Sequence, residues 1–129
     1  MIPKFRVWLT DIDQMLRVKA LVFEKDKTRC VCGYSFDFYL EDENATIMQS
    51  TGLVDKNGKE IFEGDIVRQV RTQPITENET ITGVVTMIEG AWLIMNDCEQ
   101  LASYLWSETD ENEIIGNVYE NRELFEDKE

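Results

Sequence analysis

The stretch STGLVDKNGKEIFEGDIVR, Ser50–Arg68, decides the fold that the sequence predicts. Its Asn57-Gly58 pair supplies the positive φ angles that tight turns require, and Gly64 permits a bend before a new strand. The glycines serve backbone geometry, the apolar residues serve burial, and Asp55 and Asn57 serve turn hydrogen bonds. We therefore interpret the stretch as a fold signature. The residues of this structural motif are Gly52, Leu53, Asp55, Asn57, Gly58, Ile61, Phe62, Gly64 and Asp65.

Strand-like patterns lie on both sides of the motif. Phe5–Leu9 alternates, and after a turn the run from Leu16 to Val22 places an apolar residue at every second position, which predicts a half-buried hairpin. The strongest alternation covers Cys30–Leu40 and predicts one long strand. Beyond the motif, two apolar runs meet at Glu89-Gly90. Short strands joined by tight turns are typical of a small barrel, so we expect a mainly β fold.

The remaining segments complete the predicted organisation. The polar stretch Arg71–Thr80 is expected to be a long, exposed hairpin loop. The segment "CEQLASYLW", which ends at Trp106, has helical spacing but also strand-like neighbours, and it stays open between the two. A last strand covers "EIIGNVYE", and Asn121 is expected to cap a short C-terminal helix that runs through Glu126. We predict one domain, with a strand region at about 1–49, a barrel-like region at about 50–120 and an acidic tail at 121–129.

Charge is the most unusual feature of the composition. The chain has 26 Asp and Glu against 13 Lys and Arg, a formal net charge of −13. Binding to DNA or RNA requires clustered Lys and Arg, so we expect no direct nucleic-acid contact. The same charge can attract a basic groove on another protein, or it can serve solubility alone. No run of about 18 apolar residues and no export signal occurs, so no membrane association is expected.

Cysteine and histidine usage restricts the chemistry. Histidine is absent, which excludes Ser-His and Cys-His pairs and every metal site that contains histidine. Cys30 and Cys32 share a strand face and could bind a metal together with Cys98. The alternative is that both fill core positions, which we favour because a fourth ligand is missing. We therefore expect no metal, no cofactor and no structural disulfide.

Carboxylates are the other candidates for catalysis. Asp11 with Asp13, or Glu41 with Asp42 and Glu43, could bind Mg²⁺ and hydrolyse phosphoesters. Both groups fall in predicted turns, where solvated charge is the default. A metal-dependent phosphoesterase is therefore the least favoured hypothesis, and we expect a protein that is not an enzyme.

Three segments carry a resemblance to a known family. "KFRVW" at Lys4–Trp8, the long motif at Ile47–Val67 and "EIIGNVYEN" at Glu113–Asn121 resemble the YopX family of phage and prophage proteins. The resemblance implies a mostly β fold with an SH3-like or pseudo-barrel body and additional N-terminal strands. It assigns no catalytic residues. The chain departs from the family pattern at Ala20–Asn44 and at Arg71–Thr80, so no role is carried over to those stretches.

These observations lead to three functional hypotheses. The first is a small, non-enzymatic interaction module that a phage or prophage produces in the bacterial host cytoplasm and that binds a protein partner, such as a basic host protein. The second is an acidic decoy that occupies the groove of a host DNA- or RNA-binding protein. The phosphoesterase is the third, and self-pairing of an exposed edge strand into a homo-oligomer is a further expectation. The candidate partner-binding residues are Arg71, Gln73, Pro74, Ile75, Glu77 and Trp92, although Trp92 equally suits a core position.

Overall fold

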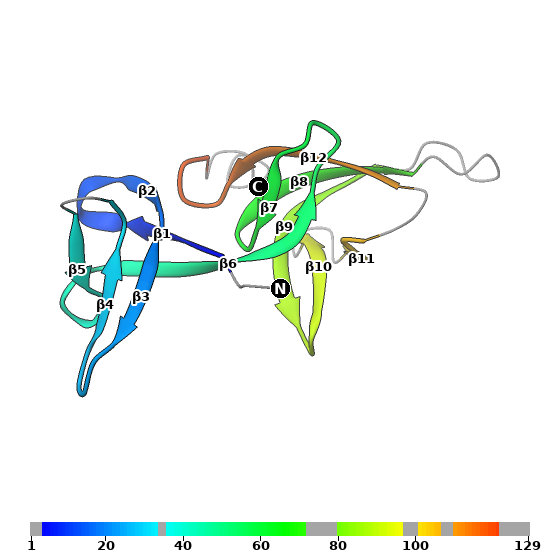
Figure 1. Cartoon of the computed structure of the whole chain (residues 1–129). Helices are drawn as coiled ribbons and strands as arrows, with labels where there is room; N and C mark the ends of the chain where they lie inside the picture. The colour runs from blue at the N-terminus through cyan, green and yellow to red at the C-terminus, as the bar shows by residue number, and fades with distance from the viewer. Residues whose placement is uncertain (1–3, 34–35, 72–79, 97–100, 107–109, 122–129) are drawn as a thin grey trace. The chain divides into compact units, whose positions relative to one another are not determined.

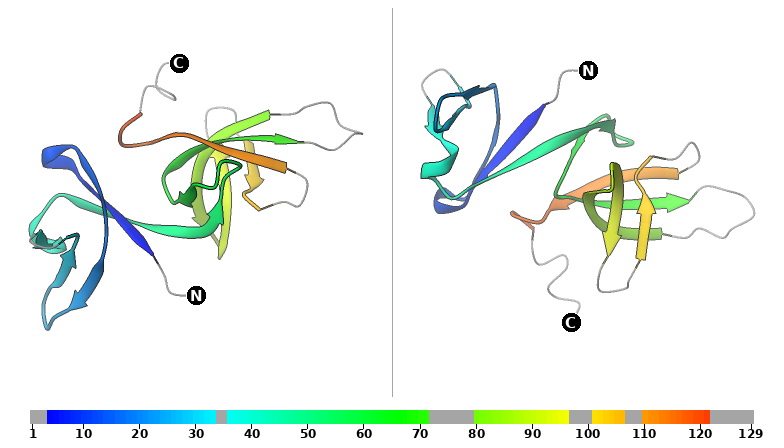
Figure 2. Two further views of the ribbon diagram at one scale, coloured as in Figure 1. Left: turned by 45° about the horizontal axis from the view of Figure 1, so that its top comes forward. Right: turned by 90° about the horizontal axis from the view of Figure 1, so that it is seen from below.

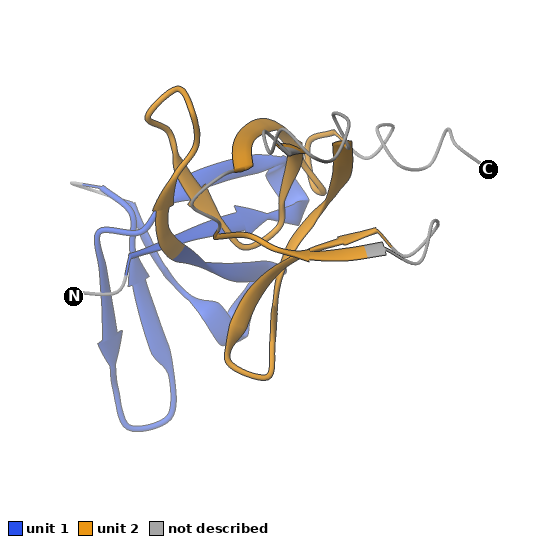
Figure 3. Cartoon of the chain, turned by 90° about the vertical axis from the view of Figure 1, so that its right-hand side faces the viewer, with its two compact units in different colours: residues 1–50 blue, residues 51–129 orange. Residues whose placement is uncertain are grey.

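The computed structural model describes residues 4–33, 36–71, 80–96, 101–106 and 110–121. The chain divides into two compact units, residues 1–50 and 51–129, which are coloured separately in Figure 3. Strands dominate both units, and the only helical elements of the described residues are two short 3-10 turns. The mainly β class is thereby confirmed. Within the described residues, no helix is long and apolar enough to span a membrane.

Unit 1 contains two small antiparallel arrangements of strands (Figure 1). Its elements are β1 (Phe5–Leu9), η1 (Thr10–Ile12), β2 (Gln14–Arg17), β3 (Ala20–Phe23), β4 (Thr28–Val31), β5 (Asp37–Tyr39), η2 (Leu40–Asp42) and the first part of β6 (Ala45–Val54). One sheet has the order β2-β1-β6-β7, in which β7 (Glu60–Phe62) belongs to unit 2, and the other has the order β3-β4-β5. Strand β6 crosses the division between the units at residues 50 and 51, because it is ten residues long.

The predicted pairing of Phe5–Leu9 with the run from Leu16 is confirmed by β1 and β2, but Leu16 to Val22 is not a single strand. It forms β2 and β3, which belong to different sheets. The division falls where the chain changes hydrogen-bond partner: Val18 N–H donates to the Phe5 carbonyl at 3.1 Å, and Lys19 N–H donates to the Val31 carbonyl at 2.7 Å. Alternation is a local property and does not reveal such a change of partner.

The predicted strand at Cys30–Leu40 is also wrong as a single element. It forms the antiparallel pair β4 and β5, and Cys32 N–H donates to the Phe36 carbonyl at 2.9 Å. Cys30 lies opposite Phe38, so even-numbered residues still share one face on both strands. The hairpin therefore preserves the alternation that made the stretch look continuous. The predicted core position of Cys30 is confirmed, since it is fully buried with Val7 and Leu9.

Unit 2 is built around one antiparallel five-stranded sheet with the order β11-β10-β9-β8-β12. Its strands are β7 (Glu60–Phe62), β8 (Asp65–Arg71), β9 (Thr80–Ile88), β10 (Ala91–Asn96), β11 (Leu101–Tyr104) and β12 (Asp110–Asn117). The sheet curls into a half-barrel, as Figure 2 shows. The predicted join at Glu89-Gly90 is confirmed: both residues have positive φ, 49° and 83°, which suits the twist of a two-residue hairpin.

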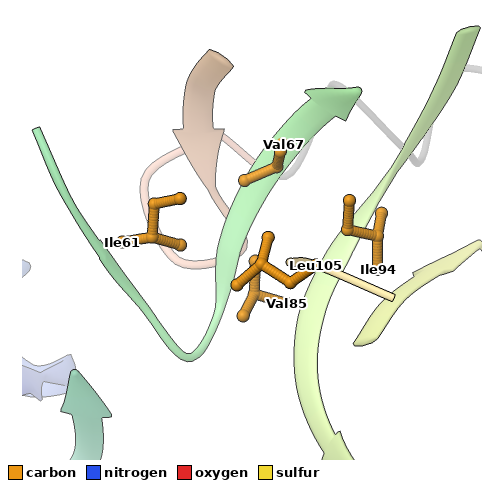
Figure 4. Close-up of a cluster of buried hydrophobic side chains, with 5 residues drawn as sticks. All are labelled: Ile61, Val67, Val85, Ile94 and Leu105. Atoms are coloured by element: carbon orange, nitrogen blue, oxygen red, sulfur yellow. The ribbon is translucent and has the colours of Figure 1, made fainter. Parts of the chain in front are cut away.

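The concave side of this sheet holds the core of unit 2. Figure 4 shows five buried side chains that point toward one another from five different segments. They are Ile61, Val67, Val85, Ile94 and Leu105. The segment left open between helix and strand contains strand β11, and the predicted last strand, Glu113–Glu120, corresponds to β12, which begins at Asp110 and ends at Asn117. The predicted C-terminal helix falls almost wholly on residues 122–129, outside the described part of the chain. Asn121 is described, and its Oδ1 accepts the N–H of Asn117 at 3.1 Å.

Close packing within the half-barrel gives a first prediction, at Gly83 on β9. A Cβ atom there would lie 2.6 Å from the Met95 carbonyl oxygen and 2.8 Å from the Ile94 Cγ2 atom. Because one of these atoms is backbone, the contact can be relieved only by moving β10. We expect Gly83→Ala to lower the free energy of unfolding by about 1–3 kcal/mol in urea denaturation. Gly33→Ala is the matched control, because a Cβ at Gly33 meets nothing within 4 Å. Equal stability of the two variants would contradict the prediction.

Candidate protein-interaction site

The buried polar residues of the Ser50–Arg68 motif are used inside the fold. Buried Asp55 accepts the N–H of Asn57 and of Lys59 on Oδ1, both at 2.9 Å, and the N–H of Ile114 on Oδ2 at 3.1 Å. One carboxylate thus closes the turn and connects it to β12. Burial alone would raise the pKa of Asp55, but the three donated hydrogen bonds hold the pKa below its ordinary value.

The three glycines of the motif adopt backbone conformations that other residues rarely adopt. Gly52, Gly58 and Gly64 have φ values of 80°, 82° and 89°, in the region that favours glycine. Asn57 does not share the positive φ expected from the Asn-Gly pair, since Asp13 and Glu89 are the only non-glycine residues with positive φ in the described part.

Thr51 and Asp65 form hydrogen bonds with the backbone of β7, in the second half of the motif. Thr51 Oγ1 donates to the Ile61 carbonyl at 2.8 Å, and Asp65 Oδ2 accepts the Phe62 N–H at 2.8 Å. Thr51, Ile61, Phe62 and Asp65 are all buried. The buried polar groups of the motif are therefore occupied within the fold. The motif also exposes Lys56, Asn57, Lys59 and Arg68, of which Lys56 and Arg68 form ion pairs with Glu113.

A buried polar network joins three strands of unit 2. Gln69 on β8 is fully buried, and its Nε2 donates at 3.0 Å both to the Tyr104 carbonyl and to Asn112 Oδ1. Its Oε1 accepts the Ser103 hydroxyl at 2.7 Å. Asn112 Nδ2 donates in turn to the Leu105 carbonyl at 2.8 Å. Because β11 and β12 are the two edge strands of the sheet, this network connects its two ends.

The same network anchors the segment Tyr104-Leu105-Trp106 at the end of β11. Leu105 is fully buried in the core, and its N–H donates to the Trp92 carbonyl at 3.0 Å. The side chains of Tyr104 and Trp106, on either side of it, are 69% and 61% exposed. We call these two residues the aromatic pair. A backbone held by several hydrogen bonds thus presents two large aromatic side chains to solvent.

The six residues predicted to bind a partner do not form one described site. Trp92 is partly buried and packs against the core cluster of unit 2, as the core alternative expects. Arg71 is the last residue of β8. Gln73, Pro74, Ile75 and Glu77 lie outside the described residues, so their assignment stays a prediction.

Sequence reasoning missed the aromatic pair and Gln69. The signal for both was alternation: in a strand, neighbours of a buried residue point to the opposite face. Leu105 inward therefore implies Tyr104 and Trp106 outward, provided that the segment is a strand. Gln69 lies two residues after buried Val67 and so shares its inward face. Because the sequence left this segment open between helix and strand, the alternation around Leu105 could not be used to predict the aromatic pair.

The cysteine pair was the strongest candidate for holding a metal. The Sγ atoms of Cys30 and Cys32 are 3.7 Å apart. Burial, followed by the charge of the neighbouring Cys32, raises the pKa of Cys30 to about 12, and burial also raises the pKa of Cys32. Both groups are therefore neutral thiols near pH 7. Cys98, the third thiol considered, lies outside the described residues.

The candidate carboxylates lie in turns, as their sequence context indicated. Asp42 forms an ion pair with Lys27 at 2.8 Å, and Asp11 accepts the side-chain amide of Asn44 at 3.1 Å. Glu41 accepts the N–H of Thr28 at 2.8 Å, and this hydrogen bond lowers the pKa of Glu41. All three carboxylates are exposed, and each has a local structural contact.

Negative charge is distributed very unevenly along the chain. Unit 1 contains seven Lys and Arg against eight Asp and Glu, which gives a net charge of −1. Unit 2 contains six Lys and Arg against eighteen Asp and Glu, which gives −12. Nearly all of the net charge therefore belongs to the unit that carries the aromatic pair.

The fold and the site define a small, mainly β protein with an acidic half-barrel unit and an exposed aromatic pair. The model of the YopX protein family matches residues 4–126, and the chain belongs to this family. It is similar over 98% of its length to protein EF1440 from Enterococcus faecalis, of which it covers 99%, with 28% identity and a TM-score of 0.62. It also shares the fold of protein yopX from Bacillus subtilis, with 22% identity, 95% and 98% coverage and a TM-score of 0.66. No curated protein matches the chain at a significant level. The expected family is confirmed.

Proposed function

We propose that this protein is a non-enzymatic interaction module, encoded by a phage or prophage, which binds a protein partner in the bacterial cytoplasm through the aromatic pair. The observation that carries the proposal is the contrast at the end of β11. Leu105 is fully buried, and the two aromatic side chains beside it are mostly in solvent. Exposed Tyr and Trp are enriched among residues that dominate binding energy in protein interfaces.

Rigidity of the segment supports this assignment. The carbonyls of Tyr104 and Leu105 accept hydrogen bonds from Gln69 and Asn112, so the backbone is ordered before a partner arrives. A preordered backbone reduces the entropy lost on binding. Strand β11 is also an edge of the five-stranded sheet, where a partner strand can add.

We further propose that unit 2 is of the SH3-like class. The support is its strand order, in which β8 to β11 form a meander and β12 returns to pair with β8. Small barrels of this kind often bind partners through aromatic side chains and loops.

The aromatic pair can be tested by capture of partners from bacterial lysate. We expect the tagged protein to retain a defined partner and the double variant Tyr104→Ser/Trp106→Ser to lose most of it, roughly tenfold or more. Both residues are exposed, so the thermal unfolding midpoint should change little. Val54→Ser is the matched control, because Val54 is another exposed apolar residue of unit 2. Undiminished capture by the double variant would contradict the proposal.

Charge asymmetry favours a second candidate function, the acidic decoy. A net charge of −12 on unit 2 is suited to a basic groove that normally holds nucleic acid. The same capture experiment distinguishes the two functions. A partner that is released between about 50 and 500 mM salt and binds nucleic acid supports the decoy, because exposed charge pairs are screened by salt. A partner that resists salt and depends on the aromatic pair supports the first proposal.

A further inference from the structure

Unit 1 contains an open hollow of about 480 Å³ that the proposed function does not use. Among the described residues, Ile12, Gln14, Leu16, Cys32 and Phe36 line it. None of the five side chains is charged near pH 7, since burial raises the pKa of Cys32 and keeps it a neutral thiol. Gln14 is the one lining residue with a strong hydrogen-bonding side chain. The hollow therefore suits an uncharged, apolar group.

The walls of the hollow are braced although they face solvent. The Phe36 ring lies edge-on to the Phe38 ring, with centroids 5.8 Å apart, and Phe38 packs against the core of unit 1. Leu16 packs against the same core. Ile12 and Phe36 are nevertheless 54% and 44% exposed. Apolar surface beside the core of unit 1 is thus left in contact with water, and covering it with an apolar group is favourable.

Strand β2 forms one wall and is also an edge of its sheet. Hydrogen bonds alternate in direction along an antiparallel strand. Val18 N–H donates to the Phe5 carbonyl, and the register pairs Val7 with Leu16, so Leu16 directs its backbone groups toward β1. Met15, which lies between Gln14 and Leu16 and is paired with Trp8, therefore directs its N–H and C=O away from β1, to the open edge.

We propose that an extended peptide segment of a partner protein adds to the open edge of β2 and inserts an apolar side chain into the hollow. In paired strands, directly opposite residues place their side chains on the same face. A partner residue opposite Leu16 therefore projects to the face that carries Leu16 and Gln14, which is the face that lines the hollow. The open edge of β2 thus binds the backbone of the partner peptide, and the hollow binds one of its apolar side chains.

Negative charge beside the hollow indicates that the partner peptide carries a basic residue. Asp11 and Asp13 lie on either side of Ile12, and both are exposed. The β1–β2 turn therefore adds negative charge at one end of the hollow. A matching segment carries an apolar residue, with Lys or Arg a few positions away toward that turn. This surface belongs to unit 1, whereas the aromatic pair belongs to unit 2.

A synthetic peptide serves as the probe. It has acetyl and amide blocked ends and a central Phe flanked by alternating Val and Thr, with a Lys near each end. Binding of a fluorescent version to the full chain is measured by anisotropy. We expect saturable binding that is weakened roughly tenfold or more by Ile12→Asp, which places a charge in the hollow. Phe23→Asp is the matched control, because Phe23 is an exposed apolar residue of unit 1, at 79%, that does not line the hollow.

A second readout reports the strand addition itself. The amide proton of Met15 should exchange with solvent more slowly in the presence of the peptide, and alkylation of Cys32 by iodoacetamide should slow in parallel, located by peptide mass mapping. Binding that persists in Ile12→Asp, or that leaves Met15 exchange unchanged, overturns the proposal. Self-association through β2 without peptide binding also overturns it, since the occupant is then a second copy. The Tyr104→Ser/Trp106→Ser variant should bind the peptide normally, which separates this surface from the proposed function.

Discussion

Asp55→Asn is expected to lower the free energy of unfolding by about 3 kcal/mol at pH 7. The carboxylate accepts three backbone N–H groups from a buried position, two from the turn and one from Ile114 on β12. An amide of the same shape has only one acceptor oxygen, so its NH2 group must face a buried N–H donor. Urea denaturation followed by circular dichroism measures the loss. Asp26→Asn is the control, because Asp26 is exposed and its replacement removes the same charge.

The stabilising effect of Asp55 should also depend on pH. Its pKa in the folded protein lies below the unfolded value of about 3.9. A depressed pKa contributes stability that is fully present above the unfolded value and is lost as the pH falls through the folded value. The stability difference between the native sequence and Asp55→Asn should therefore stay nearly constant from pH 7 down to about 4 and shrink as the pH falls further, through the folded pKa. A difference that stays constant below about pH 4 as well would show that the charge of Asp55 does not contribute.

Gln69→Leu should destabilise unit 2 by about 2–4 kcal/mol. Leucine fills a similar volume but leaves the Tyr104 carbonyl and the Ser103 hydroxyl without the partners that Gln69 provides. These groups come from β11, so the variant weakens the connection between the two ends of the sheet. The expected result is a lower midpoint in urea. Gln49→Leu, at an exposed position of β6, is the control.

A double-mutant cycle tests whether the network acts as a unit. Gln69 Nε2 donates to Asn112 Oδ1 at 3.0 Å, so the two residues share a hydrogen bond. The loss of stability in Gln69→Leu/Asn112→Leu should therefore be smaller than the sum of the two single losses. Additive losses would mean that the two residues stabilise the sheet independently. Loss of Gln69 should also weaken capture through the aromatic pair, because it holds the Tyr104 backbone.

The correct and incorrect predictions differ in the range of the interactions on which they depend. The Glu89-Gly90 turn was predicted correctly, because the φ values that it needs depend on the residues themselves. Cys30–Leu40 was predicted as one strand but forms the paired strands β4 and β5. The prediction was wrong because the pairing of Cys30 with Phe38 keeps the same alternation as one continuous strand. Gln69 was not predicted, because its partners lie more than thirty residues away along the chain.

Sequence alone determined the mainly β class, the positions of the main turns, the core role of Cys30 and the membership of the YopX family. These follow from backbone sterics, period-two alternation and a long continuous motif, all of which are local along the chain. Tertiary structure alone decided which strands pair, which polar groups are buried together, and that Tyr104 and Trp106 face solvent while Leu105 does not. Burial and pairing are properties of residues that meet only after folding, so no single segment of the sequence contains them.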